Sequence, residues 1–152
     1  MQIRLAEKED LADILKLQYL AFQSEARLCN DPNIPPLTQT PEEIQAEFEN
    51  GVFLKATDEN GDIIASVRAF SENGTLHIGK LMVHPDLQGQ GIGTRMLNEM
   101  EQTCPHDRYE MFTSEKSERN IMLYGRLGYR RYKEQNVGGK FKIIYLAKDN
   151  VR

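Results

Sequence analysis

The chain has 152 residues, of which 39% are hydrophobic and 28% charged, as expected for one soluble globular domain with little room for a second. No run of the sequence reaches the roughly 20 apolar residues that a membrane-spanning helix needs. The formal net charge of −4 disfavours nucleic acid as a partner, because an acidic protein repels its phosphates.

The first third of the chain is predicted to hold one strand and two helices. Residues 2–6 are strand-like, and apolar side chains from 8 to 24 recur at the spacing of a helix with a broad buried face. The segment 25–40 contains three prolines and no period, so we expect a long loop, which is typical of a functional segment. Thr40 and Pro41 then suit the N-cap and first position of a second helix.

Three strands are predicted next, over residues 52–57, 62–70 and 75–84. The dipeptide Asn60-Gly61 separates the first two, and Asn73-Gly74 separates the second from the third. Asn-Gly between apolar runs indicates a hairpin, because both residues can adopt positive φ. The three strands are therefore expected to form an antiparallel meander.

The second half alternates helices and strands. We predict helices over 92–104 and 117–127, a strand over 108–113, and a closing hairpin after Gly128. Because a helix precedes the strand 108–113, that strand can lie parallel to 75–84. The element order predicts an α+β fold, in which a mixed sheet carries helices on both faces.

A glycine-rich stretch, QGQGIG, lies between the third meander strand and the helix that follows. It is not a P-loop, which needs Lys and Ser or Thr after its last glycine, and a dinucleotide fingerprint starting at Gly89 fails at Thr94. The pattern Q/R-x-x-G-x-G/A fits through Gln88, Gly91 and Gly93. Backbone N–H groups at such a helix start can hold a pyrophosphate where no Cβ intervenes.

The longer stretch GKLMVHPDLQGQGIGTRML, residues 79–97, resembles the acetyl-CoA-binding motif of the GCN5-related N-acetyltransferase (GNAT) family. Residues 117–132, SERNIMLYGRLGYRRY, resemble the next motif of that family. The element order also matches, so the resemblance covers essentially the whole chain. It implies a single domain over 1–152 with a mostly antiparallel sheet of six to seven strands, splayed between strands four and five and flanked by about four helices.

The resemblance implies an acetyl-CoA-dependent N-acetyltransferase that needs no metal. Transfer to a primary amine should be direct and sequential, since no cysteine lies in the motifs to carry the acetyl group. Two alternatives stay open: a non-catalytic module that senses acyl-CoA, and an acceptor that is a protein N-terminus or lysine rather than a small molecule. The acyl chain could also be longer than acetyl.

The resemblance also implies site residues. Tyr124 falls at the general-acid position, where a phenol can protonate the leaving coenzyme A thiolate; the alternative is a helix tyrosine that packs on Leu127. His77 lies eleven residues before Gln88, where some family members place a catalytic glutamate, and it could act as base or simply pack across the strands. The implied cofactor-binding residues are Leu81, Met82, Val83, Gln88, Gly89, Gln90, Gly91, Ile92, Gly93, Thr94, Asn120 and Tyr124.

Charge is distributed unevenly along the chain: residues 1–76 hold 6 basic and 14 acidic side chains, and residues 77–152 hold 13 and 9. The basic half could contribute phosphate partners at Arg95, Lys116 and Arg119. The fold family places the acceptor beside the loop 25–40 and the second helix, where an acidic surface would attract a small cationic amine. Its acidic residues are Glu25, Asp31, Glu42, Glu43 and Glu47.

Cellular context and assembly follow from simpler features. The N-terminus lacks an apolar signal region, and Cys29 and Cys104 lack metal-ligand spacing, as do the three histidines. We therefore expect a cytoplasmic protein with reduced cysteines and no membrane partner. Because dimers are frequent among the proteins it resembles, the resemblance also allows a homodimer.

Overall fold

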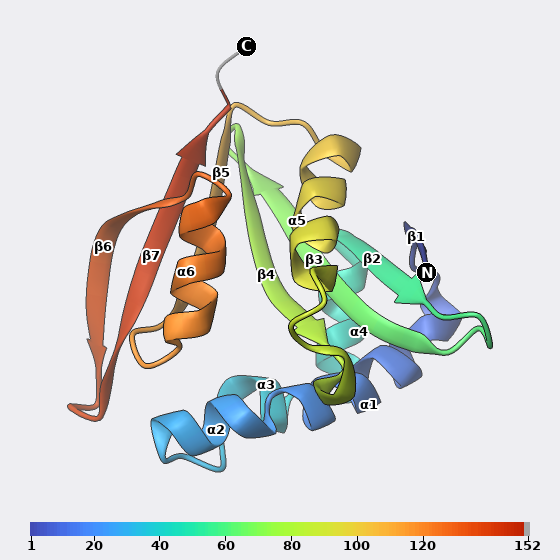
Figure 1. The fold of residues 1–152 in the computed structure, drawn as a ribbon, viewed down its shortest axis with the longest axis horizontal. Helices are drawn as coiled ribbons and strands as arrows, with labels where there is room; N and C mark the ends of the chain where they lie inside the picture. The colour runs from blue at the N-terminus through green and yellow to red at the C-terminus, as the bar shows by residue number, and fades with distance from the viewer. Residues whose placement is uncertain (151–152) are drawn as a thin grey trace.

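The computed structural model describes residues 1–150, which form one seven-stranded sheet in the order β1-β2-β3-β4-β5-β7-β6 (Figure 1). The strands are β1 Gln2–Leu5, β2 Val52–Thr57, β3 Ile63–Glu72, β4 Thr75–Val83, β5 Arg108–Ser114, β6 Arg130–Val137 and β7 Phe141–Asp149. Every neighbouring pair is antiparallel except β4 and β5, which run parallel. The predicted α+β fold with a mixed, mostly antiparallel sheet is confirmed.

The sheet splits between its fourth and fifth strands, as predicted. β4 pairs with β5 only from Thr75 to His77, which lie opposite Arg108 to Glu110. Beyond that point β5 stays paired with β7 as far as Ser114, whereas β4 continues to Val83 without a partner on this side among the described residues. The unpaired edge of β4 is therefore available to a ligand.

Helices cover both faces of the sheet. They are α1 Leu11–Ala21, α2 Gln23–Cys29, α3 Pro35–Thr38, α4 Pro41–Glu49, α5 Ile92–Thr103 and α6 Glu118–Arg126, with single 3-10 turns at Lys8–Asp10 and Pro85–Leu87. The α5 side chains Met96, Leu97 and Met100 are fully buried in the larger core on one face. Ile14 of α1 and Ile44 of α4 fill a second core on the other face.

Figure 1 shows α5 and α6 in front of the sheet and α4 behind it, while α1 and α2 run across the end at which β4 and β5 separate. None of the helices within residues 1–150 is long and apolar enough to cross a membrane.

Two expectations about residues 8–40 were wrong. The single helix expected over 8–24 is divided into a 3-10 turn, α1 and α2, and α2 extends into the segment expected to be a loop. Asn30, with φ of 51°, ends α2 in the left-handed conformation that suits a helix C-terminus. The prolines of this segment then start a helix instead of preventing one, because Pro35 occupies the first turn of α3, where no N–H is needed.

The two predicted hairpin turns differ in type. Asn73 and Gly74 both have positive φ, 52° and 83°, as a two-residue hairpin requires. In the β2–β3 connection only Gly61 does, because the Asp58 carboxylate accepts hydrogen bonds from the amides of Asn60 and Asp62 and organises a longer loop. The antiparallel meander itself is confirmed.

Candidate active site

Two cavities adjoin the split in the sheet. The first, of about 880 Å³, lies between β4, β5, α2 and α4, and the second, of about 540 Å³, lies beside the N-terminal turns of α5 and α6. Four residues line both: Phe22, Glu25, Leu81 and Asn120. The two cavities therefore meet at the unpaired edge of β4.

The glycine-rich stretch forms one wall of the second cavity. Gly89 and Gly91 both have φ of +80°, a conformation that side-chain-bearing residues rarely adopt. Gly91 is the N-cap of α5, and no side chain in the described part of the chain caps this helix. Within residues 1–150, the amides of Ile92, Gly93 and Thr94 donate to no acceptor, so the positive end of α5 faces the cavity and can bind an anion.

Most residues predicted to bind the cofactor line this second cavity. They are Leu81, Met82, Val83, Gln88, Gly89, Gly91, Ile92, Gly93, Thr94 and Asn120. Gln90 is not among the lining residues, and Tyr124 lines the first cavity instead.

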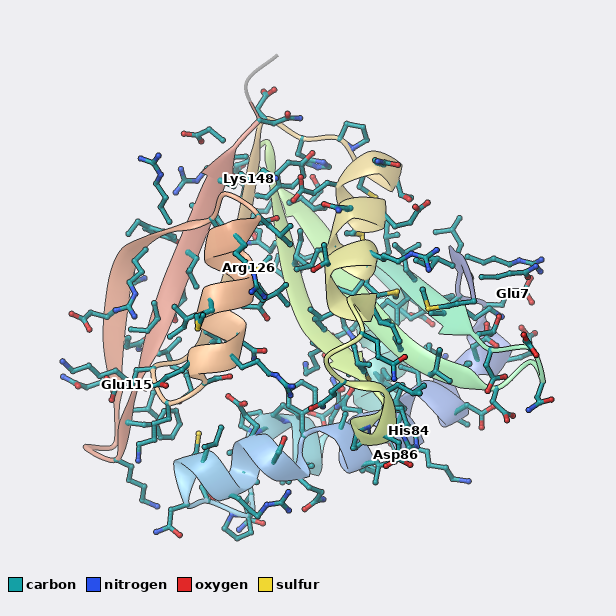
Figure 2. All side chains as sticks on the ribbon, in the orientation of Figure 1. Glu7, His84, Asp86, Glu115, Arg126 and Lys148 are labelled. Atoms are coloured by element: carbon teal, nitrogen blue, oxygen red, sulfur yellow. The ribbon has the colours of Figure 1, made fainter. Side chains whose placement is uncertain are left out.

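Cations gather at the second cavity, as an anionic ligand requires. Lys116 and Arg119 line it, and the Arg119 guanidinium donates to the Gln88 side-chain oxygen at 2.6 Å. Arg95 is exposed and does not line it. Arg126, which the sequence reasoning missed, does line it, from the side of α6 that faces α5 (Figure 2). The sequence did contain an indication of this role: Arg126 lies seven residues after Arg119, so the two side chains share one face of the helix.

A bulge interrupts β4 where the two cavities meet. Ser66 and Arg68 of β3 lie opposite Met82 and Gly79, so β4 holds one residue more than its partner over this interval. Lys80 has φ of +47° there, one position after the glycine at which the bulge was expected. The bulge directs Met82 into the α1–α4 core, whereas Ile78 packs in the α5 core.

Tyr124 is buried in the wall of the first cavity, with 6% of its surface exposed. Its ring lies 6.4 Å from that of Tyr129, and within residues 1–150 its hydroxyl forms no hydrogen bond. Burial and the nearby Glu25 charge raise the pKa of the phenol above its ordinary value of 10. The hydroxyl therefore stays protonated at neutral pH and remains able to donate a proton or hydrogen bond.

His77 also lines the first cavity, and it packs across the strands as well. Its ring stacks on Phe70 with centroids 4.8 Å apart, and Nδ1 lies 3.8 Å from the Glu110 carboxylate. His84 has a structural setting: its Nδ1 accepts a hydrogen bond from the Asp86 amide, and the two side chains lie together at the 3-10 turn (Figure 2).

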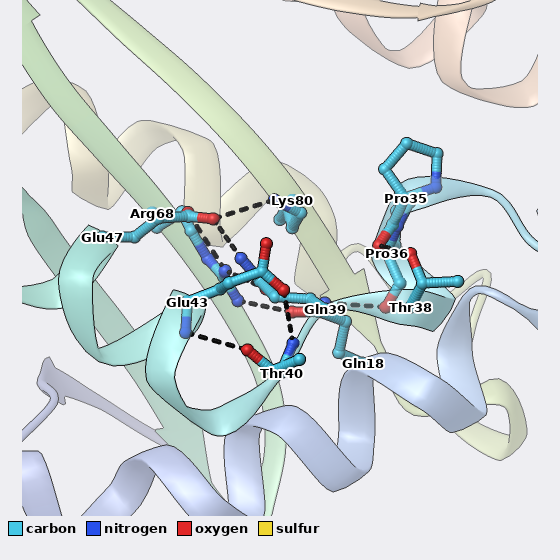
Figure 3. A network of polar contacts seen from close by, with 10 residues as sticks. All are labelled: Gln18, Pro35, Pro36, Thr38, Gln39, Thr40, Glu43, Glu47, Arg68 and Lys80. Carbon is cyan, nitrogen blue, oxygen red and sulfur yellow. Dashed lines mark hydrogen bonds and ion pairs between the residues drawn. The ribbon is translucent and has the colours of Figure 1, made fainter.

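A polar network that the sequence reasoning missed lies at the α4 side of the first cavity (Figure 3). Its centre is Arg68, which is only 4% exposed and donates to the side-chain oxygens of Gln18 at 2.7 Å, Gln39 at 3.1 Å and Glu47 at 3.2 Å. Lys80 donates to the other Glu47 oxygen at 3.2 Å. The sequence did contain an indication of this network: Arg68 is a charged residue between the apolar residues Val67 and Ala69 of a strand, and a buried charge implies buried partners.

Glu47 is consequently held as an anion between two cations. Burial would raise the pKa of its carboxyl group, but the charges of Lys80 and Arg68 outweigh burial and lower the pKa below its ordinary value. Gln39 donates a further short hydrogen bond to the same carboxylate.

The acidic surface expected near the acceptor is smaller than the sequence suggested. Of the five acidic residues, only Glu25 and Glu47 line the first cavity. Asp31 accepts from the Asn33 amide, and Glu43 forms a capping box with Thr40 at the start of α4. Both segments expected to flank the acceptor do contribute to the lining, through residues 25–36 and α4.

Comparison with known proteins agrees with an acetyl-CoA-binding site. The sequence model of the Acetyltransferase (GNAT) family matches residues 11–129. The S-(2-succino)cysteine N-acetyltransferase of Bacillus subtilis is 31% identical over 112 residues, which are 66% of this chain and 67% of that relative.

Solved structures share the fold. The ribosomal-protein-S18-alanine N-acetyltransferase of Escherichia coli superposes with a TM-score of 0.80 at 17% identity, covering 97% of this chain and 92% of that one. A phosphinothricin acetyltransferase of Sinorhizobium meliloti in complex with acetyl-CoA gives 0.77 at 17% identity, covering 97% and 87%.

Proposed function

Because the chain belongs to the GNAT acetyltransferase family and is an acetyl-CoA-dependent N-acetyltransferase, we propose that it transfers acetyl directly to the primary amine of a small molecule. One observation carries this proposal: the two cavities share Leu81 and Asn120, so cofactor and acceptor can be bound at once from opposite sides of the split. Residues 1–152 would act as one acetyltransferase domain.

The second cavity fits coenzyme A by its chemistry. Gly89 and Gly91 leave backbone amides uncovered, and Lys116, Arg119 and Arg126 supply positive charge for the phosphates. Asn120 lies at the junction, where its side chain can bind the pantetheine arm. Acetyl-CoA supplies a thioester, which is an activated acyl group.

This chain's own residues would then manage the proton transfers. The acceptor ammonium loses a proton to His77, directly or through water, and the free amine attacks the acetyl carbon. The N–C bond forms as the C–S bond breaks, the Tyr124 hydroxyl donates a proton to the departing sulfur, and the second proton lost by the nitrogen restores the Tyr124 hydroxyl through water. Backbone N–H groups near Met82 and Val83, on the unpaired edge of β4, would stabilise the negative charge on the acetyl oxygen.

A small acceptor is supported by the cavity and by one relative. A volume of about 880 Å³ suits a small molecule, and the Bacillus subtilis relative is an N-acetyltransferase of S-(2-succino)cysteine, an amino acid derivative. The Escherichia coli structure belongs to an enzyme that acetylates a protein alanine, so a protein N-terminus is the second candidate acceptor. Both acceptors are primary amines, which are cationic before they react.

The test is thiol release from acetyl-CoA with a panel of amines and with a peptide, and mass spectrometry of the products. We expect release only when an amine is present, and initial-rate lines that intersect as both substrates are varied. Parallel lines would contradict direct transfer and would implicate Cys29, which lines the first cavity; a matched Cys29→Ser variant should otherwise retain activity. Binding of acetyl-CoA without acetylation of any amine would overturn the proposal.

A further inference from the structure

Positive charge is in local excess on one wall of the first cavity. Arg68 and Lys80 form ion pairs with a single carboxylate, that of Glu47, while Glu43 acts on Lys80 through its charge without an ion pair among residues 1–150. Arg68 donates to Gln18, Gln39 and Glu47 through its two terminal nitrogens, and its buried Nε has no hydrogen-bond partner among residues 1–150. The Lys80 ammonium donates to Glu47 at 3.2 Å and can donate three hydrogen bonds. Lys80 thus retains capacity for another anion.

The other carboxylates that line the cavity do not serve as this second anion for Lys80. Glu110 is bound by Arg108 at 2.7 Å and by the Tyr132 hydroxyl at 2.9 Å. Glu25 interacts with Ser117 and Tyr124, and burial raises the pKa of its carboxyl group. Neither carboxylate forms an ion pair with Lys80 among residues 1–150.

Lys80 is also placed beside the reaction centre. It forms the β4 bulge, and the next residue, Leu81, lines both cavities. Burial lowers the pKa of the Lys80 ammonium and Arg68 lowers it further, whereas the nearby carboxylates of Glu47 and Glu43 raise it, with a net decrease. A further negative charge at this position would offset the cost of desolvating the ammonium.

We propose that Lys80 binds the carboxylate of the acceptor, and that the acceptors are amino acids rather than simple amines or polyamines. This inference rests on the proposed function and specifies the substrate of the same site. The rest of the wall favours an apolar side chain on that amino acid, since Phe22, Phe53, Phe70, Phe112 and Phe141 all line the cavity.

The direct test compares ligands that differ only in the carboxylate. N-acetyl-L-methionine and N-acetyl-L-phenylalanine would be titrated calorimetrically into the protein saturated with coenzyme A, beside the corresponding N-acetyl amino acid amides. We expect each acid to bind about 10- to 100-fold more tightly than its amide, as for a hydrogen bond to a charged group. Equal affinities, tighter binding of the amides, or binding of none of the four ligands would overturn the inference.

Three variants identify the residue. Lys80→Met should bring the acids to the affinity of the amides, and Lys80→Arg should keep most of the difference because it keeps the charge. Lys133→Met is the matched control, since Lys133 also lines the cavity but lies over the Tyr145 ring. A loss of discrimination in Lys133→Met equal to that in Lys80→Met would refute the assignment to Lys80.

Turnover separates this inference from the proposed function. Methionine and 3-(methylthio)propylamine differ by the carboxylate alone, and we expect kcat/KM for methionine to be at least about 10-fold higher. Equal acetylation of both would leave the proposed function intact and reject carboxylate recognition. If acetyl-CoA binds but neither compound is acetylated, the result contradicts the proposed function for these small amines. The comparison of the N-acetyl amino acids with their amides then still decides whether Lys80 binds a carboxylate.

Discussion

Replacing Gly91 with alanine separates ligand binding from backbone strain. Gly91 has φ of +80°, and an added Cβ would meet no heavy atom of residues 1–150 within 4 Å. The cost to the fold is therefore conformational, about 1–2 kcal/mol for an L-residue in the left-handed region. For a chain of this size that corresponds to a Tm about 2–8 °C lower. Gly61 is a matched control, because it has φ of +85° and equally open surroundings, and it lies in the β2–β3 loop and lines neither cavity.

Both variants should lose similar stability in a thermal melt, but only Gly91→Ala should lose affinity for acetyl-CoA. Its Cβ would project from the cap of α5, where the pyrophosphate is proposed to approach the amides. Loss of one hydrogen bond to a charged group costs about 1.5–3 kcal/mol, which is a factor of about 10 to 150 in Kd. The assay is calorimetric titration with acetyl-CoA below both melting temperatures. Equal Kd values for Gly91→Ala and Gly61→Ala would refute the proposed cradle.

Three further predictions concern single side chains. Tyr124→Phe should lower kcat by about 10²- to 10⁴-fold, with the Kd of acetyl-CoA unchanged, because it removes the general acid and little volume; equal turnover in steady-state kinetics would exclude Tyr124 from the mechanism. His77→Ala should change the acid limb of the kcat/KM pH profile, where a base is lost by protonation, and an unchanged profile would assign the base elsewhere or to water. The lowered pKa of Glu47 stabilises the fold above the ordinary carboxyl pKa of 4.5, and this contribution is lost as pH falls through the folded-state value. Glu47→Gln should therefore flatten the dependence of unfolding free energy on pH in that acidic range; an identical slope in urea titrations would contradict the ion-pair argument.

Features encoded by local sequence were predictable. The strand 52–57 and the helix that starts at Pro41 lie where periodicity and capping residues indicated. The glycine-rich turn could also be anticipated, because positive φ at Gly89 and Gly91 follows from residue type and position. The split in the sheet came from the resemblance to a family, since no local pattern specifies which strands separate.

Features that depend on distant contacts were not predictable. The partners of Arg68 are 50, 29 and 21 residues away in the chain, so their convergence appears only in the folded structure. The same contacts changed the interpretation of Glu47, which looked like a free acidic residue in the sequence and is a bound counterion in the structure. The division of residues 8–40 into three helices likewise depends on how Asn30 and Pro35 are placed against the rest of the fold.

The proposed binding site for the coenzyme A pyrophosphate is the stretch from Gln88 to Gly93. Its most direct test is a calorimetric titration of the purified wild-type protein with acetyl-CoA, and with NAD as the control dinucleotide. We predict micromolar binding of acetyl-CoA and no binding of NAD. A well-folded sample that binds neither, or that binds NAD equally well, would contradict this prediction.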